Sequence, residues 1–347
     1  MCQQAIWKEL VKKSFRHSYQ FPVKASHSWF PGHMHKGLGQ IQRRMANVDC
    51  VLEVHDARIP LSGRNVTFRE TVNGARPHIL VLNKQDLFPE EEKETLKQKI
   101  MDSSPNISTV LFTNCKERDC AGTAAILPTV ARLVGSTSHS QGRDGRPDST
   151  VLVVGIPNVG KSSMINRLRG LHLRIGGRPA AVGAKPGWTK SVGERIRVCD
   201  QPLIYLLDTP GISVPYIKDM HMGMKLAACS TLQDHLVGED YITDYLLYWL
   251  NTNHNFSYVE LMGLDQPEDD GSIMLAKSAI SNKKFKKVKD IRKGAGFRTL
   301  PDLQAMAIKF LKLFRSGQFG QVNLDSDMFT SIQRDRLPNQ MSKAKIY

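Results

Sequence analysis

The sequence predicts a three-layer α/β fold with a mostly parallel sheet, followed by a small all-helical C-terminal domain. Before about residue 210, short apolar runs rich in β-branched residues end at polar or Gly-rich turns, which is typical of buried parallel strands. After about residue 216, apolar residues recur at helical spacing with no strand-like run between them. The expected strands are residues 50–54, 79–82, 109–112, 151–154 and 203–207.

Helices are expected between most of these strands, over residues 90–101 and 124–134. This alternation of strands and helices is the pattern of a three-layer fold. Residues 135–150 are polar and Gly-rich, and they predict a surface linker.

Two helices with apolar faces are expected in the C-terminal domain. The first face is Ile242, Tyr245, Leu246, Trp249 and Leu250, and the second is Leu303, Met306, Ala307, Phe310, Leu313 and Phe314. The second helix is expected to begin with the capping-box pattern Thr299-x-x-Asp302 and to end before Ser316. The predicted division is a basic segment over 1–28, an α/β domain over 29–216, a helical domain over 217–330 and a flexible tail over 331–347.

Composition favours an acidic partner in a reducing compartment. The 347 residues carry a formal charge of +15, which suits nucleic acid or an anionic membrane surface. The six cysteines form no Cys-x-x-Cys pair, so neither a zinc site nor a disulfide framework is expected. No apolar stretch approaches the ~20 residues that span a bilayer, so we expect no transmembrane segment and at most a peripheral membrane contact.

The first 28 residues are basic and place apolar residues at helical spacing. They contain five lysines or arginines against the single acid Glu9. Two interpretations stay open: a mitochondrial targeting segment, or a basic amphipathic first helix that stays on the mature protein.

A phosphate-binding loop is predicted at Gly155-x-x-x-x-Gly160-Lys161-Ser162, between the apolar run 151–154 and a helix expected over 162–169. Its glycines let backbone amides surround phosphates, and Lys161 can reach the β and γ phosphates. The hydroxyl of Ser162 would bind Mg²⁺. The loop residues expected to contact nucleotide are Asn158, Val159, Gly160, Lys161, Ser162 and Ser163.

Two further segments complete the expected phosphate end. Asp208-Thr209-Pro210-Gly211 follows a strand, so Asp208 can face Mg²⁺ and the Gly211 amide can meet a γ phosphate. Thr189, in a segment broken by Gly and Pro, is the candidate switch residue that closes on Mg²⁺.

A base-reading loop is predicted at Asn83-Lys84-Gln85-Asp86, at the carboxyl end of the strand 79–82. Asp86 can accept the ring N1 and exocyclic amino hydrogens of guanine, which adenine does not offer at those places, so GTP or GDP is expected. Asn83 is expected to tie this loop to the phosphate loop, and the Lys84 stem to cover a ring face. Thr113, Asn114 and Cys115 are expected to offer a backbone amide to the guanine oxygen.

The order of these motifs is reversed relative to conventional GTPases, since the base-reading loop comes before the phosphate loop. With Trp29-Phe-Pro-Gly-His-Met34 and Asp56-Ala-Arg-Ile-Pro60, the chain resembles the circularly permuted GTPases of the ribosome biogenesis GTPase A subfamily, especially its mitochondrial branch. The resemblance covers residues 29–217. It implies a permuted P-loop GTPase fold, binding to an immature mitochondrial large ribosomal subunit, release after hydrolysis, and peripheral contact with the matrix side of the inner membrane.

The resemblance also bears on the catalytic groups. Ile212 stands where small GTPases have a Gln that orients water, and it cannot hydrogen-bond water. In the resembling family a histidine is proposed to substitute, and it corresponds to His33; the alternative is that His33 only completes the packing of its motif. Asn158 matches members activated by K⁺, so a K⁺ requirement is expected on the resemblance alone.

A basic stretch over 276–315 holds twelve lysines or arginines against two aspartates, which is +10 of the total charge. Phe285 and Phe297 interrupt it, which suits contact with rRNA, although a solvated face is the alternative. The function expected is a GTP-hydrolysing assembly factor for the mitochondrial large subunit. One alternative is a GTP-dependent binding or scaffold protein with little intrinsic hydrolysis, peripheral to a membrane. A more distant one is an ATP-using P-loop kinase, which leaves residues 83–86 without a role.

Overall fold

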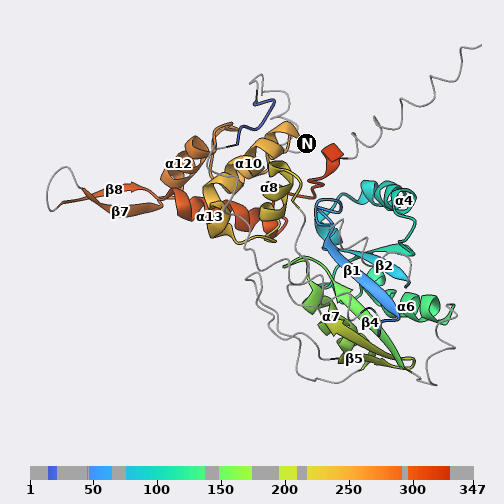
Figure 1. Cartoon of the computed structure of the whole chain (residues 1–347). Helices are drawn as coiled ribbons and strands as arrows, with labels where there is room; N and C mark the ends of the chain where they lie inside the picture. The colour runs from blue at the N-terminus through green and yellow to red at the C-terminus, as the bar shows by residue number, and fades with distance from the viewer. Residues whose placement is uncertain are drawn as a thin grey trace, which may run out of the picture. The chain divides into compact units, whose positions relative to one another are not determined.

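The computed structural model describes residues 15–21, 45, 47–64, 76–136, 148–173, 195–208, 217–290 and 296–328. The chain divides into two compact units (Figure 1). The helical unit comprises Met1–Phe30 with Asp219–Gln321, and the sheet unit comprises Pro31–Lys218 with Val322–Tyr347. Within the described ranges, no helix has the length and apolar character that crossing a membrane requires.

The sheet unit is built on a six-stranded sheet in the order β3-β2-β1-β4-β6-β5. All five expected strands are confirmed, and every pair among them is parallel. The strands are β1 (Cys50–Asp56), β2 (His78–Asn83), β3 (Thr109–Thr113), β4 (Asp148–Val154), β5 (Arg195–Asp200) and β6 (Leu203–Asp208).

The edge strand β5 was not predicted, and it runs antiparallel to β6. Its residues Arg195, Arg197 and Asp200 are charged and at least partly exposed. Such an edge strand shows no continuous apolar run, so the pattern that identifies buried parallel strands does not detect it.

Helices flank this sheet (Figure 1). They are η2 (Gln85–Leu87), η3 (Glu90–Glu92), α4 (Lys93–Ser103), α5 (Ala121–Ala124), α6 (Ile126–Gly135) and α7 (Lys161–His172). Helix α4 packs through Leu96 and Ile100 against Leu80 and Leu82 of β2. The two helices expected between strands are therefore confirmed within a few residues, and β4 begins at Asp148, inside the expected linker.

Strand register brings the carboxyl ends of the parallel strands to one edge of the sheet. Asn83 is the register partner of Asp56 on one side and of Thr113 on the other. Asp208 is the partner of Val153, two residues before the phosphate loop. The predicted base-reading and phosphate-binding segments consequently start from neighbouring positions.

The helical unit holds α8 (Met220–Ala228), α9 (Asp234–Val237), α10 (Glu239–Thr252), α11 (Tyr258–Leu261), α12 (Gly271–Ser281) and α13 (Leu303–Arg315). The expected apolar faces of α10 and α13 are largely buried, although Trp249, Leu303 and Leu313 are only partly so. These faces form the core of the unit, because α10 packs against both α12 and α13.

The all-helical prediction for this region is wrong in one respect. Strands β7 (Phe285–Asp290) and β8 (Gly296–Pro301) form an antiparallel hairpin between α12 and α13. The strands were missed because most of their side chains are exposed and neither strand alternates apolar and polar residues, so the pattern that marks a half-buried strand is absent. The capping-box prediction is also wrong: Thr299 lies in β8, and Asp302 itself caps α13 by accepting from the Ala305 amide.

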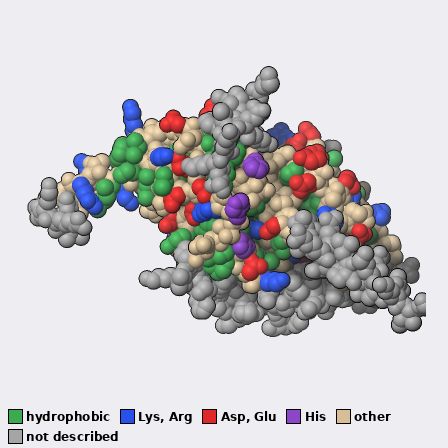
Figure 2. All heavy atoms as spheres, turned by 90° about the horizontal axis from the view of Figure 1, so that it is seen from above, with side chains coloured by type: hydrophobic (Ala, Val, Ile, Leu, Met, Phe, Trp, Pro, Cys, Tyr) green, Lys and Arg blue, Asp and Glu red, His purple; other side chains and the backbone are tan. Residues whose placement is uncertain are grey.

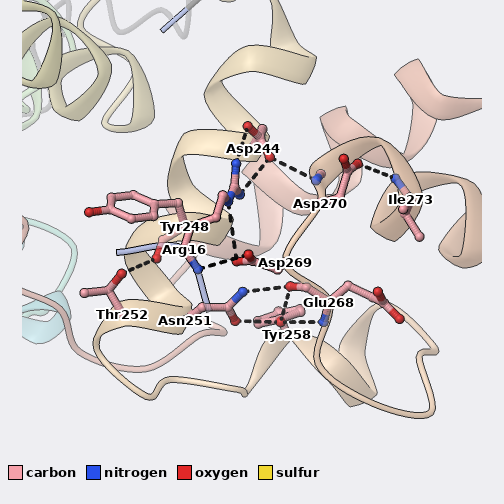
Figure 3. A network of polar contacts seen from close by, with 11 residues as sticks. Arg16, Asp244, Tyr248, Asn251, Thr252, Tyr258, Glu268, Asp269, Asp270 and Ile273 are labelled. Atoms are coloured by element: carbon pink, nitrogen blue, oxygen red, sulfur yellow. Dashed lines mark hydrogen bonds and ion pairs between the residues drawn. The ribbon is translucent and has the colours of Figure 1, made fainter. Parts of the chain in front are cut away.

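Residues 15–21 belong to the helical unit and are not a separate segment. Figure 3 shows the Arg16 guanidinium facing Asp244 of α10, to which it donates two hydrogen bonds of 3.0 and 3.1 Å. The Arg16 backbone amide and Nε donate to Asp269. Tyr19 is buried, with its ring edge-on to Tyr245 at 5.1 Å.

The chain returns to the sheet unit at Val322, earlier than the expected domain end at residue 330. The Val322 amide donates to the Leu87 carbonyl at 2.9 Å, and the Leu324 amide donates to the Arg58 carbonyl at 2.9 Å. The fully buried carboxylate of Asp325 accepts from the amides of Leu61 and Ser62, both at 2.8 Å. We call residues 322–328 the C-terminal strap.

Removing the N-terminal anchor is expected to destabilise the helical unit. A chain that lacks residues 1–21 loses the Arg16 ion pairs and the buried Tyr19, which should cost at least about 2 kcal/mol. A chain that lacks only residues 1–14 is the matched control and should unfold like the full chain. Thermal and urea unfolding measure the difference; equal stability of the two truncated chains would contradict the anchoring role.

Candidate nucleotide site

The side chain of Asn83 joins three segments at the sheet edge. Its Nδ2 donates to the Val159 carbonyl in the phosphate loop at 2.8 Å. Its Oδ1 accepts from the Thr113 hydroxyl at 3.2 Å and from the Cys115 amide at 3.3 Å. The expected tie between the base-reading loop and the phosphate loop is therefore present, and Asn83 itself is buried.

The phosphate loop turns on three residues with positive φ. Gly155 has φ 147°, and a β-carbon there would lie 2.2 Å from the Val54 carbonyl oxygen. Gly160 has φ 103°, and a β-carbon there would lie 2.2 Å from Nδ2 of Asn83. Asn158 has φ 60°, a conformation that Asn tolerates better than most residues. Only glycine fits at Gly155 and Gly160 without displacing a neighbour, so the loop closes tightly on the strand ends.

Lys161 begins α7 and folds back over the loop. Its ammonium donates to the carbonyls of Gly155 at 2.7 Å and Ile156 at 2.9 Å. Burial lowers the pKa of Lys161 to about 8, although the negative charge of Asp208 acts in the opposite direction. A poorly solvated cation at a helix N-terminus provides a binding site for a phosphate group.

The oxygen donors near the loop suit a small hard cation. Ser162 and Ser163 lie in the first turn of α7, and the buried carboxylate of Asp208 ends β6 beside β4. Across the described ranges, no cluster of three or more His, Cys, Asp or Glu side chains could hold a metal alone. This donor set fits Mg²⁺, which typically binds one or two protein oxygens together with substrate phosphates.

The base-reading loop has a fixed backbone. Lys84 adopts a left-handed conformation with φ 60°, and the turn η2 follows it from Gln85 to Leu87. Asp86 is exposed on this turn, where its carboxylate can accept hydrogen bonds from a ligand. The strap amide of Val322 is bonded to Leu87, the last residue of the same turn.

Asp56 has a role beside the base-reading loop that the sequence alone does not predict. Its fully buried carboxylate accepts a hydrogen bond of 2.8 Å from the Lys84 ammonium and two from the Arg58 guanidinium. Burial opposes its ionisation, but the charges of Arg58 and Lys84 outweigh this effect and hold the pKa of the carboxyl well below its usual range. In the sequence Asp56 is recognisable only as part of a family motif, because its contact with Lys84 exists only once β1 and β2 pair.

The backbone amides of Asn114 and Cys115, the expected donors to the guanine oxygen, donate to protein acceptors in this structure. The Asn114 amide donates to Sγ of Cys120 at 3.2 Å, and the Cys115 amide donates to Asn83. The N–O distance of 3.3 Å at Cys115 is long for such a bond. The segment thus supports Asn83 in this structure, which the sequence did not predict.

Three of the site residues predicted from the sequence, His33, Thr189 and Gly211, lie outside the described residues, as does Ile212. The described ones lie at the carboxyl ends of β2, β3, β4 and β6 or in the segments that follow these strands. Together they offer a cation and backbone amides for phosphates, oxygen donors for Mg²⁺, and a carboxylate for a base. This is the chemistry needed to bind a nucleoside diphosphate or triphosphate.

The comparisons with known proteins agree with this arrangement. Residues 150–285 match the family model described as a 50S ribosome-binding GTPase. The chain is 45% identical over 304 residues to mitochondrial GTPase 1 of Aedes aegypti, which covers 87% of this chain and 94% of that protein. It is 44% identical over 319 residues to mitochondrial ribosome-associated GTPase 1 of Bos taurus, with 92% and 94% covered.

A solved structure shares the fold. It is the crystal structure of GNP-bound YlqF from T. maritima, with a TM-score of 0.51 and 21% identity, and the match covers 83% of this chain and 97% of that one. At this identity the similarity supports the fold and nothing further.

The lowered pKa of Lys161 predicts proton uptake on nucleotide binding. Near pH 8 about half of the free protein carries a neutral Lys161, whereas bound phosphates favour the charged form. GDP binding should take up about one tenth of a proton at pH 7 and about one half at pH 8, so affinity falls as pH rises through 8. Calorimetry in buffers of different ionisation enthalpy measures this uptake.

The control for this measurement is Lys161→Met, which should bind GDP more weakly and lose the pH-dependent uptake. Identical uptake at pH 7 and pH 8 in the unmodified protein would show that Lys161 is fully charged before the nucleotide binds.

Proposed function

Because the chain belongs to the mitochondrial GTPase 1 family, we propose that this GTP-hydrolysing protein acts on the mitochondrial large ribosomal subunit and that its nucleotide state controls association and release. Family membership makes the chain a mitochondrial, circularly permuted GTPase. The observation that supports the proposal most is the Asn83 bridge, because it joins a guanine-reading loop and a phosphate loop in one site.

The proposed ligands follow from the donor groups. Lys84 and Asp86 would contact guanine, Asn83 would hold their loop in place, and Thr113, Asn114 and Cys115 would support Asn83 beside the base. Residues 158–163 and Gly211 bind the phosphates. Ser162, Thr189 and Asp208 would hold Mg²⁺, which would supply charge neutralisation for the phosphates when bound. K⁺ near Asn158 is proposed on the family resemblance, together with the left-handed conformation of that residue.

Lys161 and Thr189 are proposed to stabilise the charge that develops on the transferred phosphoryl group. His33 is proposed to orient the attacking water, since Ile212 cannot. Residues 209–219 directly connect Asp208 to helix α8. We propose that this segment transmits the nucleotide state from the phosphate site to the part of the protein that binds the ribosome.

The proposed location is the matrix side of the inner membrane, with peripheral contact and no spanning segment. The charge of +15 supports attraction to anionic lipid as well as to rRNA. Since residues 15–21 are part of the helical unit, we also propose that any removed targeting segment ends before Phe15.

Single-turnover hydrolysis with and without purified mitochondrial large subunits tests the proposed function. We expect subunits to accelerate hydrolysis, and His33→Ala to abolish most of the acceleration while leaving GTP affinity unchanged. His35→Ala, a neighbouring histidine outside the proposed role, is the matched control.

Two outcomes would count against this proposal. A rate that does not respond to subunits would favour a GTP-dependent scaffold. A normal subunit-stimulated rate in His33→Ala would remove His33 from the mechanism and leave the rest of the proposal intact.

A further inference from the structure

One face of the β7–β8 hairpin combines exposed aromatic rings with lysines. Residues directly opposite each other in an antiparallel pair point to the same face, and successive residues alternate between faces. The register pairs Lys287 with Thr299 and Lys289 with Phe297. With Phe285, these residues form what we call the aromatic face.

The aromatic face is exposed. The relative accessibility is 48% for Phe285 and 73% for Phe297, unusually high for phenylalanine. The hairpin extends away from α12 and α13, the helices that precede and follow it (Figure 1). Figure 2 shows hydrophobic and basic side chains together at the end of the helical unit that carries the hairpin.

The hairpin lysines differ from other basic residues of the same stretch. Lys277 forms an ion pair with Glu268, and Arg315 binds both oxygens of Asp234 at 2.7 Å. Lys309 donates to Asn282. Among the described residues, Lys287 and Lys289 have no such partner. Part of the predicted basic surface therefore stabilises the fold, while the hairpin charges remain available to a ligand.

The composition of the aromatic face favours RNA over the other partners. Lysine is depleted from the centres of interfaces between proteins, yet here Lys287 lies between the two aromatic residues and Lys289 lies directly opposite Phe297. A hairpin that enters a membrane needs contiguous apolar residues, whereas Phe285 and Phe297 lie about four residues apart along the hairpin, roughly 13 Å. Separated rings with lysines beside them match a nucleic-acid strand, in which phosphates lie beside bases.

Unpaired RNA fits the face better than a duplex does. Bases in a duplex are already stacked on each other, and the major groove of A-form RNA is too deep and narrow for side chains to read. Unpaired bases can stack on aromatic rings, at about 1–3 kcal/mol each, while lysines follow the backbone.

We propose that the aromatic face of the β7–β8 hairpin binds an unpaired RNA segment, with Phe285 and Phe297 stacking on bases and Lys287 and Lys289 contacting phosphates. The inference rests on the proposed function, since it specifies how the protein contacts rRNA. It also assigns the contact to one face of one hairpin and not to the basic stretch as a whole.

Binding of the full-length protein to a labelled 12-nucleotide oligouridylate, a matched RNA duplex and purified mitochondrial large subunits tests the inference. Phe285→Leu with Phe297→Leu keeps apolar side chains but removes the rings, and should weaken oligouridylate binding at least about tenfold. Phe285→Tyr with Phe297→Tyr should restore it. The duplex should bind more weakly than the single strand and respond little to either change.

Two charge variants form a matched pair. Lys287→Gln with Lys289→Gln removes two charges from the aromatic face, and Lys286→Gln with Arg298→Gln removes two from the opposite face. The first pair should weaken binding and flatten its salt dependence by more than the second. Equal losses from both pairs would mean that the hairpin attracts RNA only through its total charge, and would overturn the inference.

Other outcomes separate this inference from the proposed function. Unchanged RNA binding by the leucine variant, or displacement of RNA by phosphatidylcholine vesicles containing an anionic phospholipid, would overturn the hairpin assignment. If these variants still bind subunits as the unmodified protein does, the proposed function survives without the hairpin. If the unmodified protein binds no subunits, the proposed function itself fails. Unchanged GDP affinity and thermal unfolding verify that the variants fold.

Discussion

The hydrogen bonds of Asn83 are the constraint on which the nucleotide site depends. One side chain links the end of β2 to the phosphate loop after β4 and to the segment after β3. Gly160 has no side chain at the point where a β-carbon would meet Nδ2 of Asn83. The reversed order of the motifs leaves this arrangement intact, because parallel strands bring their carboxyl ends to the same edge whatever their order along the chain.

A second set of contacts surrounds the base-reading loop. The buried Asp56 holds the Lys84 ammonium, and its own charge is balanced by Arg58. The C-terminal strap is bonded to both parts, through the Leu87 carbonyl and through the Arg58 carbonyl. The chain therefore leaves the sheet unit after β6, builds the helical unit, and ends its described course on the loop that reads the base. The helical unit is therefore joined covalently to the sheet unit after Phe30, before Asp219 and after Gln321.

The sequence predicts the parts of this fold that rest on local pattern. Five buried strands and the phosphate loop follow from apolar runs and glycine spacing, and Asn83 and Asp86 follow from their place after a strand. Strand β5 and the hairpin were missed because both are largely exposed and show neither a continuous apolar run nor an apolar–polar alternation. The docking of Asp325 on Leu61 joins residues 264 positions apart, and the Asp56–Lys84 contact requires two strands to pair. No pattern of neighbouring residues in the sequence predicts either contact.

Asn83 holds the two loops together before nucleotide binds, and hydrogen exchange on the free protein tests this most directly. The amides to follow are hydrogen-bonded ones beside each loop: Met164, which donates to the Gly160 carbonyl, and Leu87 and Phe88, which donate to the carbonyls of Lys84 and Gln85. In Asn83→Ala these amides should exchange together, at least about tenfold faster than in the unmodified protein. Asn114→Ala, which removes a neighbouring side chain that does not reach the phosphate loop, should leave Met164 unchanged, and normal protection of Met164 in Asn83→Ala would contradict the bridging role of Asn83.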